Sequence, residues 1–159
     1  MEEVFAILCC MDALDRKILA HVQADGRLTI TELADRVQLS VSRVQRRLRE
    51  LERAGVIRGY RAVVDAAAIG FGFEALVFAK LRIESMDDFD RALVDVPNVV
   101  EAQRLFGSPD YLLRVVTADL ASYQRLYEET LAKLPGVRGL TSTIVMKQVI
   151  EPRPLPTHP

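Results

Sequence analysis

The 159-residue chain has 50% hydrophobic and 27% charged residues and no low-complexity tract, a composition that indicates a folded globular protein and excludes a disordered one. Its first apolar stretch, residues 4–11, is too short to span a bilayer and follows two glutamates, so we expect a cytoplasmic protein without a membrane anchor or signal peptide; the adjacent Cys9 and Cys10 suit neither a disulfide framework nor a zinc site. The net charge of −1 is unevenly divided, because residues 11–65 hold eleven basic and eight acidic residues.

Residues 11–64 show three successive stretches with the periodicity of α-helices. The first starts near Asp12, and the second follows Thr29 and Glu32, which have the spacing of a capping box. We expect one small core to form from the apolar side of these helices. That side consists of Leu14, Ile18, Leu19 and Val22, then Leu33, Ala34 and Val37, then Val44, Leu48 and Leu51.

The third stretch has a defined start and end. Ser40 stands where an N-cap is expected, and Gly55 stands at the C′ position. Only residues 38–40 separate this helix from the second one, which is the spacing of a helix-turn-helix. Residues 56–64 then alternate as in a β-strand, so a short strand or wing is predicted to complete a winged helix-turn-helix domain, and residues 65–74 are predicted to form a hinge.

Residues 75–150 contain two copies of a strand–helix–strand plan. The predicted elements are strand 75–83, a helix capped by Ser85 with Met86, Phe89 and Leu93 inward, a strand ending at Phe106, strand 111–117, a helix with Leu120, Tyr123, Tyr127, Leu131 and Leu134 inward, and strand 140–150. The order βαββαβ predicts a ferredoxin-like α+β domain, in which both helices cover one face of an antiparallel sheet. Residues 151–159 form a proline-rich C-terminal tail.

The other face of this sheet is also predicted to be apolar. Leu76 and Phe78 alternate with Val77 in the first strand, and Ile144 and Met146 alternate with Val145 and Val149 in the last. Soluble monomers rarely leave so large an apolar patch in water. Two sheets packed face to face would cover it, which predicts a homodimer.

The outer face of the third helix is the candidate DNA-binding surface. Residues 38–61 hold seven arginines and only two acidic residues, Glu50 and Glu52. In the major groove Gln and Arg bind the edges of adenine and guanine, while Ser and further Arg side chains hold phosphates. The alternative is a face that is only solvated or paired with the two glutamates, in which case Arg49 and Arg53 are the first to be lost as DNA contacts. The candidates are Ser40, Ser42, Arg43, Gln45, Arg46, Arg49 and Arg53.

An enzyme is not expected from this sequence, and neither is a metal or cofactor. His21 lies in the first helix and His158 in the tail, and no Cys–His pair, phosphate loop or metal-ligand cluster is present. The spacing of Tyr123 and Tyr127 predicts core packing rather than a ligand box. The alternative function is a metabolite-binding or catalytic ferredoxin-like protein whose helix-turn-helix mediates protein contacts, and DNA binding distinguishes the two.

Several short strings recur in a characteristic order and spacing over residues 12 to about 150. They are Leu14-Asp15-Arg16, Asp25-Gly26-Arg27, Glu32-Leu33-Ala34, Leu39-Ser40, Leu51-Glu52, Gly55-Val56-Ile57, Gly59-Tyr60, Phe106-Gly107-Ser108-Pro109-Asp110-Tyr111 and Leu134-Pro135-Gly136-Val137. In this order they resemble the leucine-responsive and asparagine-synthesis regulator (Lrp/AsnC) family. Gln38 departs from the pattern, because the family usually has Gly in the turn. Residues 1–10 have no counterpart and are expected to be a disordered extension, with Met11 as an alternative start.

The resemblance implies a DNA-binding transcription regulator whose second domain, the RAM domain, binds an amino acid or related metabolite between dimers near residues 107–110. It also implies that dimers associate further, commonly to octamers. Asp110 would bind an α-ammonium and Ser108 a carboxylate, whereas the alternative is a plain turn formed by Pro109 and Asp110. Residues 141–143 are candidate partners or ordinary strand residues. The candidate effector-binding residues are Gly107, Ser108, Asp110, Thr141, Ser142 and Thr143.

Overall fold

The computed structural model describes residues 11–157, so the expectations for Cys9, Cys10, the extension at residues 1–10 and His158 lie outside the described residues. The chain forms two compact units. The helical unit comprises residues 11–63 together with 150–157, and the sheet unit comprises Val64–Val149. No helix within the described residues is long and apolar enough to cross a membrane.

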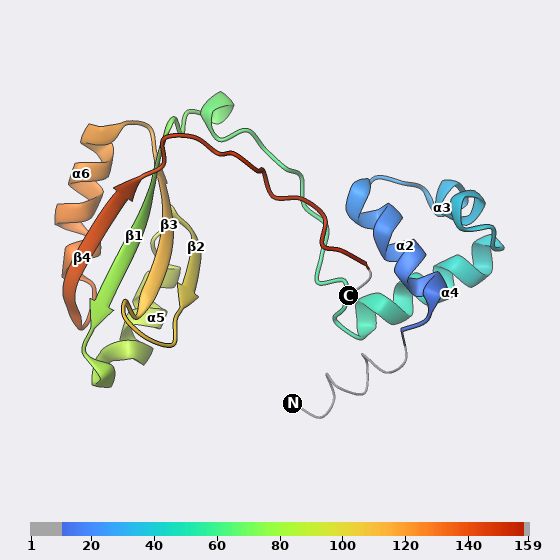
Figure 1. Cartoon of the computed structure of the whole chain (residues 1–159), viewed down its shortest axis with the longest axis horizontal. Helices are drawn as coiled ribbons and strands as arrows, with labels where there is room; N and C mark the ends of the chain where they lie inside the picture. Colours follow the sequence, from blue (N-terminus) through green and yellow to red (C-terminus); the bar gives the residue numbers. More distant parts are fainter. Residues whose placement is uncertain (1–10, 158–159) are drawn as a thin grey trace. The chain divides into compact units, whose positions relative to one another are not determined.

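The helical unit contains the three predicted helices, α2 (Ala13–Ala24), α3 (Ile30–Val37) and α4 (Val41–Arg53) (Figure 1). Side chains satisfy the free N–H groups at the start of the first two. The Asp12 carboxylate accepts hydrogen bonds from Leu14 and Asp15, and Thr29 and Glu32 exchange the two hydrogen bonds of a capping box. Most of the predicted core is confirmed: Ile18, Leu33, Ala34, Val37, Val44 and Leu51 are buried, and Leu19, Val22 and Leu48 pack against them partly buried. Leu14 is only partly buried and does not belong to this core.

The predicted strand over residues 56–64 does not form, so that element of the prediction is wrong. Instead, the backbone N–H groups of Val56 and Ile57 donate to the carbonyl oxygen of Leu51, at 3.0 and 3.2 Å, and the chain folds back at the end of α4. The Tyr60 hydroxyl donates to Glu52 at 2.9 Å, and burial together with this carboxylate raises the pKa of Tyr60 to about 12. The alternating pattern is present, but the segment has no neighbouring strand with which to pair.

The turn between α3 and α4 passes through the left-handed region at Gln38, where φ is 57°. A side chain with a Cβ costs about 1–2 kcal/mol in this conformation, whereas glycine adopts it freely. Gln38 is exposed, so its side chain contributes no core packing that would offset this cost.

Gln38→Gly is therefore expected to raise the free energy of unfolding of the helical unit by about 0.5–1 kcal/mol, after allowance for the greater freedom of glycine in the unfolded chain. Thermal unfolding of the full-length protein would measure the change. Gln38→Ala is the matched control and should not stabilise, because alanine keeps the Cβ. A lower Tm for the glycine variant than for the alanine variant would contradict the strain at this turn.

The C-terminal residues belong to the helical unit. The Gln23 side-chain amide donates to the carbonyl oxygen of Leu155 at 3.3 Å and accepts from its N–H at 2.8 Å. Arg16 donates to the carbonyl oxygen of Thr157 at 3.0 Å. Because Pro154 and Pro156 have no N–H group, Leu155 is the one residue of this triplet that can both donate and accept.

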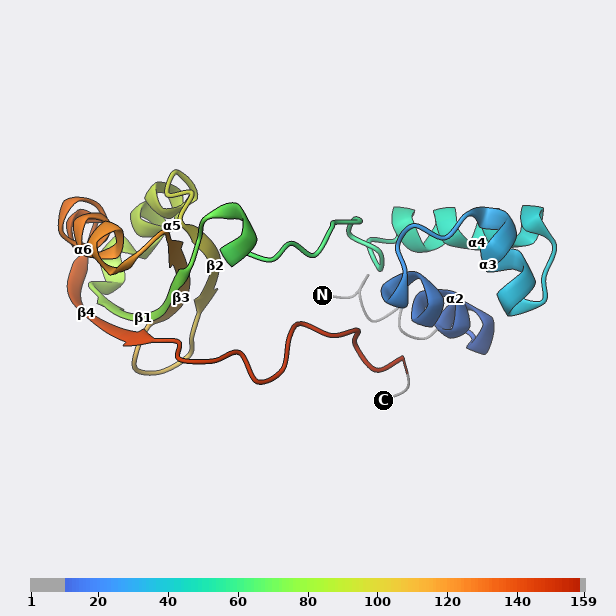
Figure 2. The same ribbon diagram turned by 90° about the horizontal axis from the view of Figure 1, so that it is seen from above.

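The sheet unit has the predicted ferredoxin-like βαββαβ order. Its elements are β1 (Phe73–Leu81), α5 (Met86–Val94), β2 (Val99–Arg104), β3 (Tyr111–Thr117), α6 (Leu120–Glu129) and β4 (Val137–Ile144), with 3-10 turns at Ala67–Ile69, Ile83–Ser85 and Leu131–Lys133. The strands lie in the order β2-β3-β1-β4, and every neighbouring pair is antiparallel. Figure 2 shows α5 and α6 on the same face of the sheet. The fold class is confirmed.

The core of this unit lies between the sheet and its two helices. The ring of Phe89 is completely buried, with its centroid 4.8 Å from that of Tyr111. Tyr123 is also buried, and its ring centroid lies 5.3 Å from that of Phe73, which confirms a packing role. The prediction for Leu120 is wrong, because 57% of this residue is exposed at the first position of α6. Ser85 precedes α5 but makes no side-chain capping hydrogen bond.

The last strand differs most from its predicted limits. It begins three residues earlier than expected, at Val137, and ends at Ile144 instead of residue 150. The reason is the length of its neighbour, since Ile144 already pairs with Ala75 near the start of β1. Met146 and Val149 are thus exposed outside the sheet, and their predicted place on it is wrong.

Candidate nucleic-acid interface and effector site

The exposed side of α4 is a stripe of polar and basic residues opposite the core residues Val44 and Leu51. Positions spaced by three and four residues share one side of a helix. This spacing brings together Ser42, Gln45, Arg46, Arg49 and Arg53, all of them exposed, and we call these five residues the α4 stripe. Arg43 is exposed beside the stripe, and Ser40 precedes the helix.

Ser40 occupies the N-cap position of α4, but its side chain makes no capping hydrogen bond, contrary to the prediction. Its hydroxyl oxygen lies 3.3 Å from that of Ser42 instead. Both residues are exposed. The start of α4 therefore presents two hydroxyl groups, and its free backbone N–H groups favour an anion such as a phosphate.

The ion pair on this surface involves a different arginine from the two expected. Arg46 donates to Glu50 at 2.8 Å, while Arg53 donates to the carbonyl oxygen of Arg49 at 3.4 Å. The side chains of Arg46 and Glu50 are 62% and 46% exposed, and such i, i+4 pairs contribute only about 0.3–0.5 kcal/mol. Arg46 can leave this pair for a DNA base at little cost.

Arg47 has a structural role that the sequence analysis did not assign. Its guanidinium donates to Asp15 at 2.7 Å and lies 2.8 Å from the carboxylate of Asp12, so it joins α4 to the start of α2. The hydrogen bond to Asp15 raises the pKa of Arg47 further. Hydrogen bonding to the backbone of Asp15, with Arg47 nearby, lowers the pKa of Asp12. The contact therefore fixes the orientation of α4, which carries the stripe, relative to α2.

Arg47→Met is expected to lower the free energy of unfolding of the helical unit by about 1 kcal/mol at neutral pH, because Asp15 loses its partner while only partly hydrated. The backbone N–H of Asp15, which the variant keeps, is the largest cause of the lowered pKa of Asp12, and Arg47 lowers this pKa further. The stabilisation that Arg47 gives is present above the ordinary pKa of 3.8 and is lost as the pH falls through the lowered value. The difference between parent and variant should therefore shrink in acid. Urea unfolding at several pH values measures it. Arg49→Met, which removes an arginine without an ion pair in residues 11–157, should change stability by less than about 0.5 kcal/mol.

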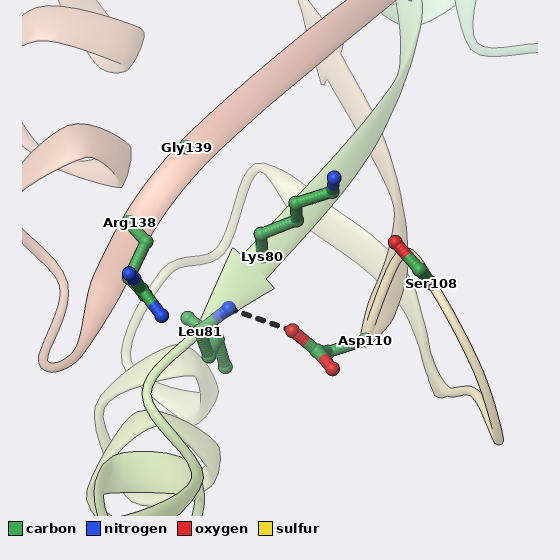
Figure 3. A pocket seen from close by; sticks show the side chains of 6 residues that line it. All are labelled: Lys80, Leu81, Ser108, Asp110, Arg138 and Gly139. Carbon is green, nitrogen blue, oxygen red and sulfur yellow. Dashed lines mark hydrogen bonds between the residues drawn. The ribbon is translucent and has the colours of Figure 1, made fainter.

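A second candidate site lies where β1, β4 and the loop before β3 meet. A hollow of about 350 Å³ is lined there by Lys80, Leu81, Ser108, Asp110, Arg138 and Gly139 (Figure 3). An adjoining hollow of about 430 Å³ shares Lys80, Ser108 and Gly139 and extends to Phe78 and Thr141. Together they form one depression on the face of the sheet that the helices leave uncovered, which we call the sheet-end hollow.

The pairing of β1 with β4 shapes the sheet-end hollow. Lys80 pairs with Gly139 and Leu81 pairs with Val137, so Arg138 is an extra residue in a β-bulge. Bulges redirect a side chain at the end of a ladder. Opposite Lys80, Gly139 contributes no side chain, and a Cβ placed there would meet no atom within 4 Å. The bulge thus places the guanidinium group of Arg138 at the hollow, and the lack of a side chain at Gly139 leaves the hollow open.

Asp110 holds the loop against β1. Its N–H donates to the carbonyl oxygen of Ala79 at 3.0 Å, and its Oδ2 accepts from the N–H of Leu81 at 2.7 Å, the bond drawn in Figure 3. One carboxylate oxygen is thus occupied by the backbone. The other oxygen is the one that an ammonium group would use.

The predicted effector-binding residues do not all come together. Ser108, Asp110 and Thr141 line the sheet-end hollow, whereas Gly107 lies in the loop with φ 139° and is not part of the lining. Thr143 pairs with Leu76 farther along the uncovered face. Ser142 pairs with Val77 and its hydroxyl meets that of Tyr123, which places it on the helix-covered face.

Sequence reasoning missed Lys80 and Arg138, because neither belongs to a recognisable string and the bulge that aims Arg138 is not visible in the sequence. The described residues contain no cluster of three or more His, Cys, Asp or Glu side chains that could hold a metal ion.

Two family models match the two units. The Lrp/AsnC ligand binding domain matches residues 74–155, and the winged helix-turn-helix DNA-binding model matches residues 11–58. The chain belongs to the Lrp/AsnC family. This Lrp/AsnC protein is therefore a DNA-binding transcription regulator, which agrees with the α4 stripe and with the function that the sequence implied.

Relatives of this Lrp/AsnC regulator are similar over nearly their whole length. It is 39% identical to the leucine-responsive regulatory protein of Rhizobium meliloti over 142 residues, which are 87% of this chain and 91% of the relative. It is 37% identical to the Bkd operon transcriptional regulator of Pseudomonas aeruginosa, covering 88% and 94% of the two chains. A transcriptional regulator from Neisseria meningitidis, solved in complex with L-Met, superposes with a TM-score of 0.88 at 34% identity and covers 92% and 97%.

Proposed function

We propose that this regulator binds duplex DNA through the α4 stripe and that an amino acid or related metabolite in the sheet-end hollow alters DNA binding. The observation that carries the proposal is the exposed stripe on the third helix of a helix-turn-helix. Arg43, Arg49 and Arg53 have no acidic partner within residues 11–157, so they are available to phosphates. The relatives are bacterial, and bacterial chromosomal DNA lies in the cytoplasm, so DNA binding would place the protein there.

The stripe divides into two kinds of DNA contact. A helix fits the major groove, where Gln45 can pair with adenine and Arg46 with guanine, each through two hydrogen bonds. Ser40, Ser42, Arg43, Arg49 and Arg53 then hold phosphates and set the position of the helix. Base preference would therefore depend on Gln45 and Arg46, and general affinity on the others.

Fluorescence anisotropy with the protein's own upstream DNA tests this proposal. Binding should weaken steeply as salt rises, because each arginine that contacts a phosphate displaces a counterion. Adding the effector should shift the binding curve. Absence of binding at low salt would overturn the regulatory function and leave the alternative, a ferredoxin-like protein whose helix-turn-helix contacts other proteins. The relatives described above are named as transcription regulators, which supports the expectation that DNA binding will be observed.

The uncovered face of the sheet supports assembly as a homodimer. Leu76, Phe78 and Leu112 are only half-buried there, and Arg114 donates two hydrogen bonds of 2.8 Å to Glu74 beside them. A second copy packed on this face across Leu76 and Leu112 would bury the apolar residues of both copies through one symmetric contact. The sheet-end hollow would then lie at the edge of the contact, because its cations are near the end of β1 and the start of β4. Association of dimers to an octamer is proposed from the family resemblance.

Phe78→Glu is expected to convert the dimer to a monomer, because it would bury a charge within the proposed contact. Multi-angle light scattering measures the mass of each species. Ala121→Glu adds the same charge on the exposed side of α6 and should leave the dimer intact. An unchanged mass for Phe78→Glu would show that the dimer uses another surface.

A further inference from the structure

The charges of the sheet-end hollow do not balance. Lys80 and Arg138 contribute two positive charges, and Asp110 contributes one negative charge. No ion pair or side-chain hydrogen bond involves Lys80 or Arg138 within residues 11–157. One oxygen of Asp110 is already occupied by the N–H of Leu81. The charged side chains that line the hollow therefore sum to one positive charge.

An amino acid with an uncharged side chain would not remove this surplus. Its ammonium group would meet the free oxygen of Asp110 and its carboxylate would meet one of the two cations, with Ser108 as a further donor. The other cation would remain without a partner. A ligand with a second carboxylate satisfies both Lys80 and Arg138, and an arginine binds a carboxylate through two parallel hydrogen bonds.

We propose that the effector is an acidic amino acid, which carries two carboxylates and one ammonium group. This inference rests on the proposed effector site and adds the charge of the ligand to it. Two features of this chain support it beyond the charge count. The bulge places Arg138 at the wall of the hollow, and Gly139 leaves open the space beside Lys80 that a second carboxylate would occupy.

Isothermal titration calorimetry of the full-length protein tests the inference by comparing L-glutamate with L-glutamine, which has nearly the same shape but one charge fewer. Glutamate should bind about tenfold more tightly or better, the effect of one additional charged hydrogen-bonded contact. 2-Oxoglutarate, which lacks the ammonium group, should bind more weakly than glutamate. Arg138→Gln and Lys80→Gln should each remove most of the preference for glutamate over glutamine. Arg125→Gln, on α6, is the matched control and should retain it.

Gly139→Val tests the location. A valine side chain would occupy the hollow without backbone strain, so glutamate binding should be lost while the fold, measured by circular dichroism, is retained. Equal affinity for glutamine and glutamate, or for 2-oxoglutarate and glutamate, would overturn the inference while leaving an effector site in place. Undiminished glutamate binding by Gly139→Val would place the ligand elsewhere. If none of the twenty amino acids binds, both the effector site and the inference are wrong.

Discussion

Phe89→Ala is expected to lower the free energy of unfolding of the sheet unit by about 3–5 kcal/mol. The side chain is completely buried between α5 and the sheet, and its ring packs on that of Tyr111. Truncation removes both the buried apolar surface and the contacts of the ring, and it leaves a cavity that the surrounding strands can fill only in part. A loss of this size is a large fraction of the stability of an ordinary domain, about 5–15 kcal/mol.

Differential scanning calorimetry of the full-length protein measures this effect. The helical unit has its own core and should keep its transition, while the transition of the sheet unit moves to a lower temperature. Leu120→Ala is the control, because this leucine is largely exposed and its removal should cost less than about 0.5 kcal/mol. A loss below about 1 kcal/mol for Phe89→Ala would mean that the core is less tightly packed than the burial of this ring indicates.

Gln45→Ala and Arg46→Ala are expected to relax base preference, each at a cost of about 1–3 kcal/mol on the preferred sequence. Each variant should lose discrimination at the base pair that it contacts and little affinity for unrelated DNA. Arg53→Ala should weaken binding to all sequences alike and reduce the salt dependence, because its proposed partner is a phosphate.

Anisotropy titrations against a set of single-base variants of the binding site measure both effects. Glu50→Gln is an informative companion, because it removes the ion pair with Arg46 without shortening a side chain. Binding should become slightly tighter while base preference is retained. If Gln45→Ala and Arg46→Ala both keep the preference profile of the parent protein, the α4 stripe is not the surface that recognises bases.

The sequence predicts those parts of the fold that depend on local pattern. The capping box of Thr29 and Glu32 and the periodic burial of Ile18 and Val44 require only neighbours along the chain, and they are found where expected. The caps expected from Ser40 and Ser85 are exceptions, because neither side chain makes a capping hydrogen bond. The strand over residues 56–64 and the end of β4 were predicted wrongly because a strand also requires a partner of matching length. Whether such a partner is available depends on residues far away in the sequence, as in the pairing of β4 with β1.

The two candidate sites also differ in whether local sequence pattern or the pairing of distant segments forms them. The α4 stripe follows from helical spacing, so its exposed residues could be identified before the structure was known. The sheet-end hollow depends on strand register, which decides that Thr141 rather than Ser142 lies on the uncovered face and that Arg138 is the bulged residue. Register is set by pairing between distant segments. Lys80 and Arg138 consequently carried no signal in the sequence.

The hydrogen bonds between Gln23 and Leu155 join residues separated by 132 positions, and they have a consequence for synthesis on the ribosome. Domains fold as units, and an N-terminal domain folds first as the chain emerges. The three helices will therefore be complete, with the amide of Gln23 still hydrated, long before Leu155 has been translated. Attachment of the segment around Leu155 then follows the folding of the three helices, and it can occur only after this segment has emerged.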